Sequence, residues 1–283
     1  MILGVLGGSG LYDFDGLSDP RLDEVSTPFG PPSASVASGG IGSTRLLFLP
    51  RHGRGHRYSP SEINYRANVF ALKTLGAERV LSVSAVGSLR EGLAPGDFVL
   101  PDQFIDKTWG RASTFFGDGV VGHVGFAEPT CAAFTAAVAA AASSGGKRVH
   151  RGGTYVCMEG PQFSTRAESQ LHRSWGADVI GMTGATEAKL CREAEVCFVS
   201  LALVTDYDAW HAEEAAVSVE AVIAVLRANV AGAQDIIRRL GDHVASAAPC
   251  GCARAAAHAI ITAPDAISAE ARGRLRLLHG RDL

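Results

Sequence analysis

Four short polar segments contain the residues whose types and spacing could do chemistry, and each directly follows an apolar run typical of a strand. They comprise residues 7–10, 51–56, 84–88 and 205–208. Ligands of open α/β sheets bind at the carboxyl ends of the strands, so we expect these segments to meet at one edge of a largely parallel sheet. Arg51 offers a fixed fork of donors, and His52 adds another when it is protonated. Ser9 and Ser84 offer hydroxyls and the glycines leave backbone N–H groups free, so the set predicts an oxyanion site for which phosphate is the natural ligand.

The first of these segments, Gly-Gly-Ser-Gly, could instead hold a dinucleotide or be a plain tight turn. A dinucleotide fingerprint needs the pattern G-x-G-x-x-G at the start of a helix. Gly8 and Gly10 fit this pattern, but Asp13 stands where the third glycine should be, and residues 12–16 are typical of a loop. A nicotinamide-dependent oxidoreductase is therefore disfavoured, and failure to bind NAD would exclude it.

The sequence gives only weak indications of a bound metal. His52 and His56 have the i, i+4 spacing of helical metal ligands, but Gly53 and Gly55 argue against a helix and no carboxylate lies nearby. The six cysteines are Cys131, Cys157, Cys191, Cys197, Cys250 and Cys252. Their spread favours reduced, packed thiols. Cys250-Gly-Cys252 could be a redox pair or half a metal site, yet no second Cys/His pair of suitable spacing follows it, so we expect no metal.

Composition and length indicate an ordinary globular α/β protein. The 283 residues are 47% hydrophobic and 19% charged, with a formal net charge of −3, which excludes a polybasic nucleic-acid binder. We expect a single domain over residues 1–283, because no linker-like shift in composition and no internal repeat is present. No leader-like segment precedes the first expected strand, and the Ala-rich run at 131–142 is too short to span a bilayer. We therefore expect no membrane partner and a cytoplasmic location.

Strand-like and helical patterns alternate along the chain, which predicts a central mixed, largely parallel sheet flanked by helices. The expected strands are 2–6, 46–49, 80–86, 98–100, 179–182 and 196–204. Ser59, Pro60 and Glu62 suit the start of a helix that runs to about Gly76. Thr165 and Glu168 form a second capping pattern, for a helix that ends near Gly176. Further helices are expected from Pro129 to about 143, over 217–240, and beyond Gly251.

Seven ordered segments together carry a resemblance to a known family. They read GGSGLY, RHGRGHRYSPSEINYRAN, SAVGSLREGLAPGDFVLPDQFIDKT, FAEP, MEGPQFSTRAES, WGADVIGMT and TDYDAW. The chain resembles the trimeric purine nucleoside phosphorylase family, in particular its 5′-methylthioadenosine phosphorylase branch, from Gly4 to about Glu220. The resemblance implies that inorganic phosphate attacks the anomeric carbon of a purine nucleoside, without a cofactor. It also implies a homotrimer.

The resemblance also implies roles for individual residues. Phosphate would be held by Ser9, Arg51, His52, Ser84, Ala85 and Thr183. Met182 would lie against the ribose, and Phe163 would stack on the base, with Ser164 beside it. Ser164 equally suits a helix N-cap, and both roles are compatible.

Asp206 would be the partner of the purine N7 atom. Departure of the base puts negative charge on the purine, so an acid near N7 lowers the barrier. Such an aspartate needs a raised pKa, which the second carboxylate, Asp208, would favour. An Asx-rich turn with solvated carboxylates is the structural alternative for this pair.

Asp206 also favours a 6-aminopurine, because the 6-oxopurine enzymes of the family place Asn there. A 6-oxopurine or 5′-methylthioinosine phosphorylase on the same scaffold is the alternative, and a nucleoside-binding protein without catalysis is a more distant one. In the family, the segment of His123 reaches the 5′ pocket of a neighbouring subunit, which His56 would also line, although His56 suits a role in loop packing as well. Gly125 stands where many relatives carry Pro, so the preferred 5′ substituent stays open.

Overall fold

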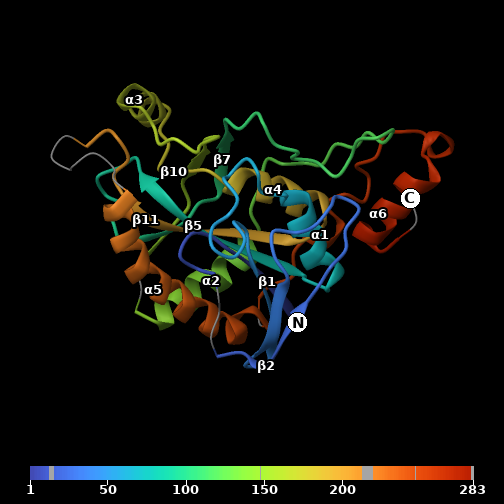
Figure 1. Cartoon of the computed structure of the whole chain (residues 1–283), viewed down its shortest axis with the longest axis horizontal. Coiled ribbons are helices and arrows are strands. Elements are labelled where there is room, and N and C mark those ends of the chain that lie inside the picture. Colours follow the sequence, from blue (N-terminus) through green and yellow to red (C-terminus); the bar gives the residue numbers. More distant parts are fainter. Residues whose placement is uncertain (13–15, 147, 212–218, 246, 282–283) are drawn as a thin grey trace.

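The computed structural model describes residues 1–12, 16–146, 148–211, 219–245 and 247–281 (Figure 1). One eleven-stranded sheet runs through the described chain, with β2-β3-β4-β1-β5-β10-β9-β7 in order and β11, β6 and β8 joined through β5. The strands are β1 (Ile2–Gly7), β2 (Ser18–Asp23), β3 (Val36–Ile41), β4 (Thr44–Pro50), β5 (Arg79–Ser88), β6 (Phe98–Leu100), β7 (Gln103–Asp106), β8 (Val149–Arg151), β9 (Thr154–Cys157), β10 (Val179–Gly181) and β11 (Cys197–Asp206).

The central pairings are parallel and the outer ones are mixed. β1 pairs in parallel with β4 and β5, and β11 pairs in parallel with β5. The β2–β3, β3–β4, β5–β10 and β6–β11 pairs are antiparallel. The expectation of a mixed, largely parallel sheet between helices is confirmed.

Strand β5 is where the sheet divides. Residues 79–83 of β5 pair with β1, whereas Gly87 and Ser88 pair with β10, and β11 follows β5 from Arg79 to Gly87. Between the β1 and β10 pairings, residues 84–86 have a partner in β11 only. This divergence opens the sheet beside Ser84, where a ligand can reach the strand.

Helices cover both faces of the sheet (Figure 1). They are α1 (Tyr65–Thr74), α2 (Ala132–Ser144), α3 (Arg166–Ser174), α4 (Gly184–Glu193), α5 (Val219–Ala245) and α6 (Ala269–His279), with 3₁₀ turns at Cys252–Arg254 and Pro264–Ala266. On one face α2 and α5 pack on the sheet through residues such as Phe134 and Ile236. On the other face α1, α4 and α6 contribute residues such as Phe70, Leu190 and Leu275. Burial of these apolar surfaces holds the three layers together. Within the described residues, no helix is both long and apolar enough to cross a bilayer.

One predicted helix start is wrong. Glu62 does accept a bond from the Ser59 backbone N–H, at 2.9 Å, but the chain turns there and α1 begins only at Tyr65. Asn64 is the N-cap, because its side chain accepts the Ala67 N–H at 3.1 Å. The local signal at Ser59 therefore stabilises a turn, and a second cap five residues later starts the helix.

The other helix predictions match the structure closely. The Thr165–Glu168 capping box is present in both directions and opens α3. The Ala-rich helix is α2, and the long amphipathic pattern corresponds to α5. The first two residues of that predicted range, 217 and 218, lie outside the described residues. The expected strands are all present within a few residues. Sequence reasoning missed five strands: β2, β3, β7, β8 and β9.

Candidate active site

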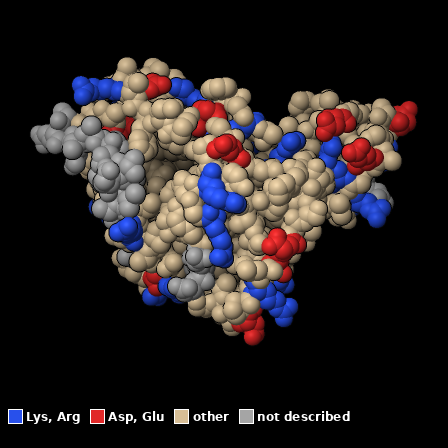
Figure 2. Space-filling model, viewed as in Figure 1, with Lys and Arg blue, Asp and Glu red and all other residues tan. Residues whose placement is uncertain are grey.

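A cleft of about 1020 Å³ lies where the sheet divides, and all four polar segments reach it. Its wall includes Ser9 and Gly10 after β1, Arg51 and His52 after β4, residues 84–87 of β5, and Asp206 and Asp208 at the end of β11. Figure 2 shows the molecule hollowed near the ends of β5 and β10, among side chains that are mostly uncharged. The fold therefore brings together segments that are far apart in the sequence.

Arg51 is held by the protein itself. Its side chain is fully buried and forms a bidentate ion pair with buried Glu187 of α4, with Nε···Oε1 at 2.6 Å and Nη2···Oε2 at 3.0 Å. Ser82 Oγ joins the pair, and Arg51 Nη1 donates to the Val83 carbonyl at 2.7 Å. These bonds use most of the guanidinium donors, and the Nη1 atom keeps one N–H for a ligand. Glu187 and Ser82 were not singled out from the sequence, because nothing local marks them as partners of Arg51.

The glycines after β1 make room for this arginine. A side chain at Gly8 would place its Cβ 2.7 Å from Arg51 Nη1 and 2.5 Å from the Val83 carbonyl oxygen. Gly10 adopts a φ of +79°, which disfavours other residues. The Gly-rich segment is therefore required for close packing as well as for access of a ligand to Ser9.

His52 is neutral in the folded protein. Burial, assisted by the charge of Arg51, lowers the pKa of His52 to about 3. Its Nδ1 lies 2.8 Å from the Tyr58 carbonyl, which can only accept, so Nδ1 carries the proton and Nε2 is an acceptor. Burial disfavours the charged ring, so at neutral pH the folded protein offers Nε2 as an acceptor, and the donor role of protonated His52 stays a prediction.

His56 packs on His52 and bonds to Tyr12. The two imidazole rings stack with centroids 4.2 Å apart, and His56 Nδ1 lies 2.9 Å from the Tyr12 hydroxyl. Burial lowers the pKa of His56 as well. Both His56 and Tyr12 line the cleft.

Two hydroxyls face the cleft without protein partners that would occupy them. Ser84 Oγ is buried and has no hydrogen-bond partner among the described residues. Thr183 is the N-cap of α4, but its side chain makes no capping bond. Because the positive end of α4 starts at Thr183, this corner of the cleft favours an anion.

Asp206 is placed by a bulge at the end of β11. The register of β11 against β5 shifts between Val204 and Asp206, which turns the carboxylate toward the cleft. A Cβ at Gly87 would lie 2.9 Å from Asp206 Oδ1, so glycine is needed opposite it.

The surroundings of Asp206 favour its protonated form. Burial is the main cause of a raised pKa, and the nearby Asp208 charge adds to it. Thr205 Oγ1 lies 2.7 Å from Asp206 Oδ2 and 3.2 Å from the Val86 carbonyl. One hydroxyl proton cannot fully serve two acceptors, and a proton on Asp206 would resolve this conflict.

Asp208 presents a free acceptor. Its backbone N–H donates to Asp206 Oδ1 at 2.8 Å, whereas its own Oδ2 is buried without a hydrogen-bond partner in the described part of the chain. A buried carboxylate oxygen without a donor is costly unless a ligand supplies one.

Aromatic and thioether side chains form the wall beside these carboxylates. Phe163 is 46% exposed on its own chain and lines the cleft together with Met158 and Met182. Ser164 is half-buried beside Phe163, with its hydroxyl 3.9 Å from the Met158 sulfur, and is not part of the cleft wall. Thr165, rather than Ser164, is the N-cap of α3, so the N-cap alternative for Ser164 is wrong.

The apolar end of the cleft is built by α5. Leu226, Arg227 and Val230 line it, and sequence reasoning missed all three. The only signal of Leu226 and Val230 was a position on the apolar stripe of a long helix, which equally predicts core packing, and nothing local marked Arg227.

His123 lies outside the cleft of its own chain. It is exposed on the long connection between β7 and α2, where its backbone N–H donates to the Ala259 carbonyl at 2.8 Å. Exposed apolar residues lie on the same connection and on the segment paired with it, namely Trp109, Val121 and Ile261.

The chain is similar in sequence to known proteins. The sequence profile of the phosphorylase superfamily matches residues 2–240. An S-methyl-5′-thioadenosine phosphorylase of Geobacter sulfurreducens is 55% identical over 280 residues, which cover 99% of this chain and 98% of the relative. One of Koribacter versatilis is 50% identical over 279 residues, covering 99% and 96%.

Solved structures are similar as well. A methylthioadenosine phosphorylase from an antarctic soil metagenomic library superposes with a TM-score of 0.92 at 47% identity and covers 98% of each chain. The methylthioadenosine phosphorylase from Schistosoma mansoni, in complex with adenine, has a TM-score of 0.83 at 38% identity, covering 88% of this chain and 93% of that one.

Proposed function

Because the chain belongs to the phosphorylase superfamily, we propose that it catalyses phosphorolysis of 5′-methylthioadenosine, giving adenine and 5-methylthioribose 1-phosphate. One observation carries the proposal: a corner suited to an anion and the Asp206–Asp208 pair line the same cleft. The names of the relatives, S-methyl-5′-thioadenosine phosphorylases at about half identity over the full length, support the choice of substrate.

Phosphate occupies the corner of Ser9, Ser84 and Thr183. In the described part of the chain the Ser84 hydroxyl has no hydrogen-bond partner and the Thr183 side chain makes no capping bond, so both can donate to phosphate oxygens. The Ala85 backbone lies where β5 lacks a β1 partner, and the remaining Nη1 proton of Arg51 completes the set. The reaction proceeds without a metal or organic cofactor.

His52 selects a protonated form of the phosphate. With its proton on Nδ1, the ring offers Nε2 as an acceptor, and the P–OH group of monohydrogen phosphate is the matching donor. The bound anion thereby keeps two charges for the attack, and the neutral ring adds no charge that would weaken the nucleophile.

Asp206 assists departure of the base. Phosphate attacks C1′ while the C1′–N9 bond breaks, and the bonding electrons move into the purine ring. A protonated Asp206 donates to N7 and neutralises this charge, as its raised pKa allows. Asp208 Oδ2 accepts a proton of the exocyclic 6-amino group, which gives that buried oxygen its missing donor. Phe163 stacks on the base, and Met182 lies against the ribose.

The 5′ substituent lies toward α5 and the neighbouring subunit. Leu226 and Val230 give this end of the cleft an apolar wall, which suits a methylthio group better than a hydroxyl. His56 forms the facing wall. In the cytoplasmic homotrimer that we propose, His123 of the partner subunit closes the pocket, which explains why His123 is exposed on the single chain.

The test is the specificity constant for three nucleosides at saturating phosphate. We expect kcat/KM to be highest for methylthioadenosine, lower for adenosine and lowest for inosine. An inosine-type substrate that reacts fastest would contradict the role of Asp208 and favour the 6-oxopurine alternative on the same scaffold.

A further inference from the structure

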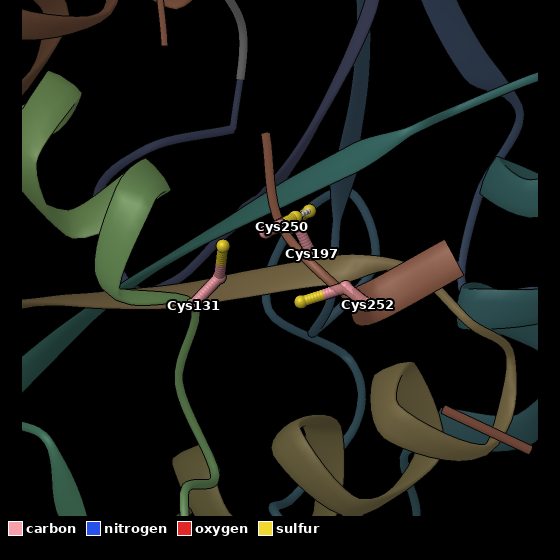
Figure 3. A group of neighbouring side chains, drawn as sticks. All are labelled: Cys131, Cys197, Cys250 and Cys252. Atoms are coloured by element: carbon pink, nitrogen blue, oxygen red, sulfur yellow. Dashed lines mark hydrogen bonds between the residues drawn. The ribbon is translucent and has the colours of Figure 1, made fainter. Parts of the chain in front are cut away.

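The structure assembles four cysteines from three distant parts of the chain into one cluster. Cys131 lies at the start of α2, Cys197 at the start of β11, and Cys250 and Cys252 follow α5. Their four Sγ atoms all lie within 4.8 Å of one another, and the Sγ atoms of Cys197 and Cys250 are 3.3 Å apart (Figure 3). We propose that this cluster binds a single zinc ion through four thiolates and that the ion fastens the C-terminal segment to the sheet.

The sulfur spacing fits one metal ion. Four thiolates at about 2.3 Å from a zinc ion form a tetrahedron with edges of about 3.8 Å. The observed distances between the Sγ atoms differ from this edge length by amounts that small side-chain rotations can remove. A Cys-x-Cys pair supplies two ligands from one turn, and Cys131 and Cys197 supply the other two from the sheet side.

The backbone at Cys131 and at Cys252 is held in place before any metal binds. The Cys131 N–H donates to the Phe198 carbonyl at 2.9 Å, which ties the start of α2 to β11 beside Cys197. The Cys252 carbonyl accepts the Ala255 N–H at 3.1 Å within a 3₁₀ turn. Such preorganisation lowers the cost of bringing the four ligands together.

Positive charge close to the cluster suits a negatively charged ligand set. Cys131 is the N-cap residue of α2, where the helix dipole favours negative charge. Arg79, paired in register with Cys197 on β5, packs over the Phe134 ring and has a buried Nη1 without a hydrogen-bond partner in the described part of the chain. Its charge offsets part of the net charge of −2 that a zinc tetrathiolate carries.

Access and burial also suit a structural site. Cys131, Cys197 and Cys252 are buried, whereas Cys250 is exposed, so an ion can enter from the surface. Binding releases the thiol protons, so affinity falls as the pH is lowered. The site lies at the α2 and α5 side of the sheet, among residues of that core layer, and does not belong to the catalytic cleft.

Metal analysis of the full-length chain, purified with a phosphine reductant and without chelators, tests the proposal. We expect about one zinc per chain, release of zinc on addition of a mercurial that blocks thiols, and a lower Tm after removal of zinc by a chelator. Replacement of zinc by Co²⁺ should give the visible absorption of a tetrahedral tetrathiolate.

Variants locate the ion. Cys131→Ser with Cys252→Ser should abolish zinc binding. Cys191→Ser, at a buried cysteine outside the cluster, should keep about one zinc per chain. Reduced wild-type protein that takes up no zinc when titrated with Zn²⁺ alone would overturn the proposal. So would native protein whose cluster cysteines are joined in disulfides, or zinc that persists in the double variant.

Discussion

The surroundings of the Asp206 carboxylate influence its pKa in opposite directions. Burial and Asp208 favour a proton on it, whereas Thr205 and the Asp208 N–H stabilise its charge. Burial dominates, so the residue is suited to share a proton with the base. A buried acid of this kind serves catalysis and costs stability.

Asp206→Asn should therefore lower the activity and raise the stability of the protein at neutral pH. We expect turnover of methylthioadenosine to fall by about 10²–10⁴-fold, because general acid catalysis is lost. A raised pKa means that the charged form of Asp206 is disfavoured in the folded state. Asp206 therefore lowers the free energy of unfolding as the pH rises through its folded pKa. The variant should have a higher Tm than wild type at neutral pH and a similar Tm in acid.

Two controls accompany this variant. Asp265→Asn, at an exposed aspartate outside the cleft, should change neither quantity. Wild type should lose kcat/KM as the pH rises through the folded pKa of Asp206, and this decline should be absent from Asp206→Asn. Unchanged adenine release in the variant would remove Asp206 from the chemistry.

His52 predicts a loss of stability in acid. Its pKa is about 3 in the folded protein against 6.5 ordinarily, so between these values the unfolded chain binds one more proton. Stability is complete above pH 6.5 and falls toward pH 3 by at most about 1.4 kcal/mol per pH unit. His52→Asn keeps a donor for the Tyr58 carbonyl and does not titrate, so its urea-unfolding free energy should fall less steeply. An equal slope in both proteins would contradict a neutral His52.

At the scale of elements, the Arg51–Glu187 pair joins β4 to α4 beneath the cleft. Both side chains are about 1% exposed, so neither charge can be solvated if the other is removed. The pair therefore stabilises the fold and also lies beside the proposed phosphate site. A loss of activity in a variant cannot by itself tell these two roles apart.

Arg51→Ala should lower the unfolding free energy by about 3–5 kcal/mol, because it leaves a buried carboxylate unpaired. Arg51→Met combined with Glu187→Leu should recover part of the loss. Urea unfolding at constant pH measures both. If Arg51→Ala unfolds like wild type and only the KM for phosphate rises, the structural role is wrong.

The α5 wall makes a separate prediction about the 5′ group. Val230→Thr keeps the shape of the side chain and replaces one methyl group by a hydroxyl, so the preference for methylthioadenosine over adenosine in kcat/KM should fall about tenfold. Val149→Thr, at a valine of β8 that is half-buried like Val230 but lies outside the cleft, is the matched control and should leave the ratio unchanged. An unaltered ratio in Val230→Thr would place the 5′ group elsewhere.

Sequence reasoning located helices, strands and cleft residues where a pattern among neighbouring residues marked them. The capping box at Thr165 placed α3, and the polar segments after β1, β4, β5 and β11 placed the cleft. Partners across the chain left no local trace: Glu187 for Arg51, Val230 for the apolar wall, and Cys131 for Cys250. The charge state of His52 was also missed, because burial cannot be read from neighbouring residues.

At the scale of the whole molecule, the apolar residues around His123 predict assembly. Trp109, Val121 and Ile261 are 85%, 49% and 67% exposed on the single chain, which is unfavourable unless another surface covers them. Light scattering after size-exclusion chromatography should give three times the 29.5 kDa chain mass. A stable, fully active monomer would contradict a 5′ pocket completed by His123 of the partner subunit.

Phosphorus NMR of the reaction products, combined with chromatography of the released base and sugar, tests the central claim most directly. Methylthioadenosine incubated with the protein and inorganic phosphate should give adenine and an equal amount of a sugar 1-phosphate, and omission of phosphate should stop both. Adenine released together with free methylthioribose, at a rate independent of phosphate, would identify a hydrolase and contradict the proposed phosphate site.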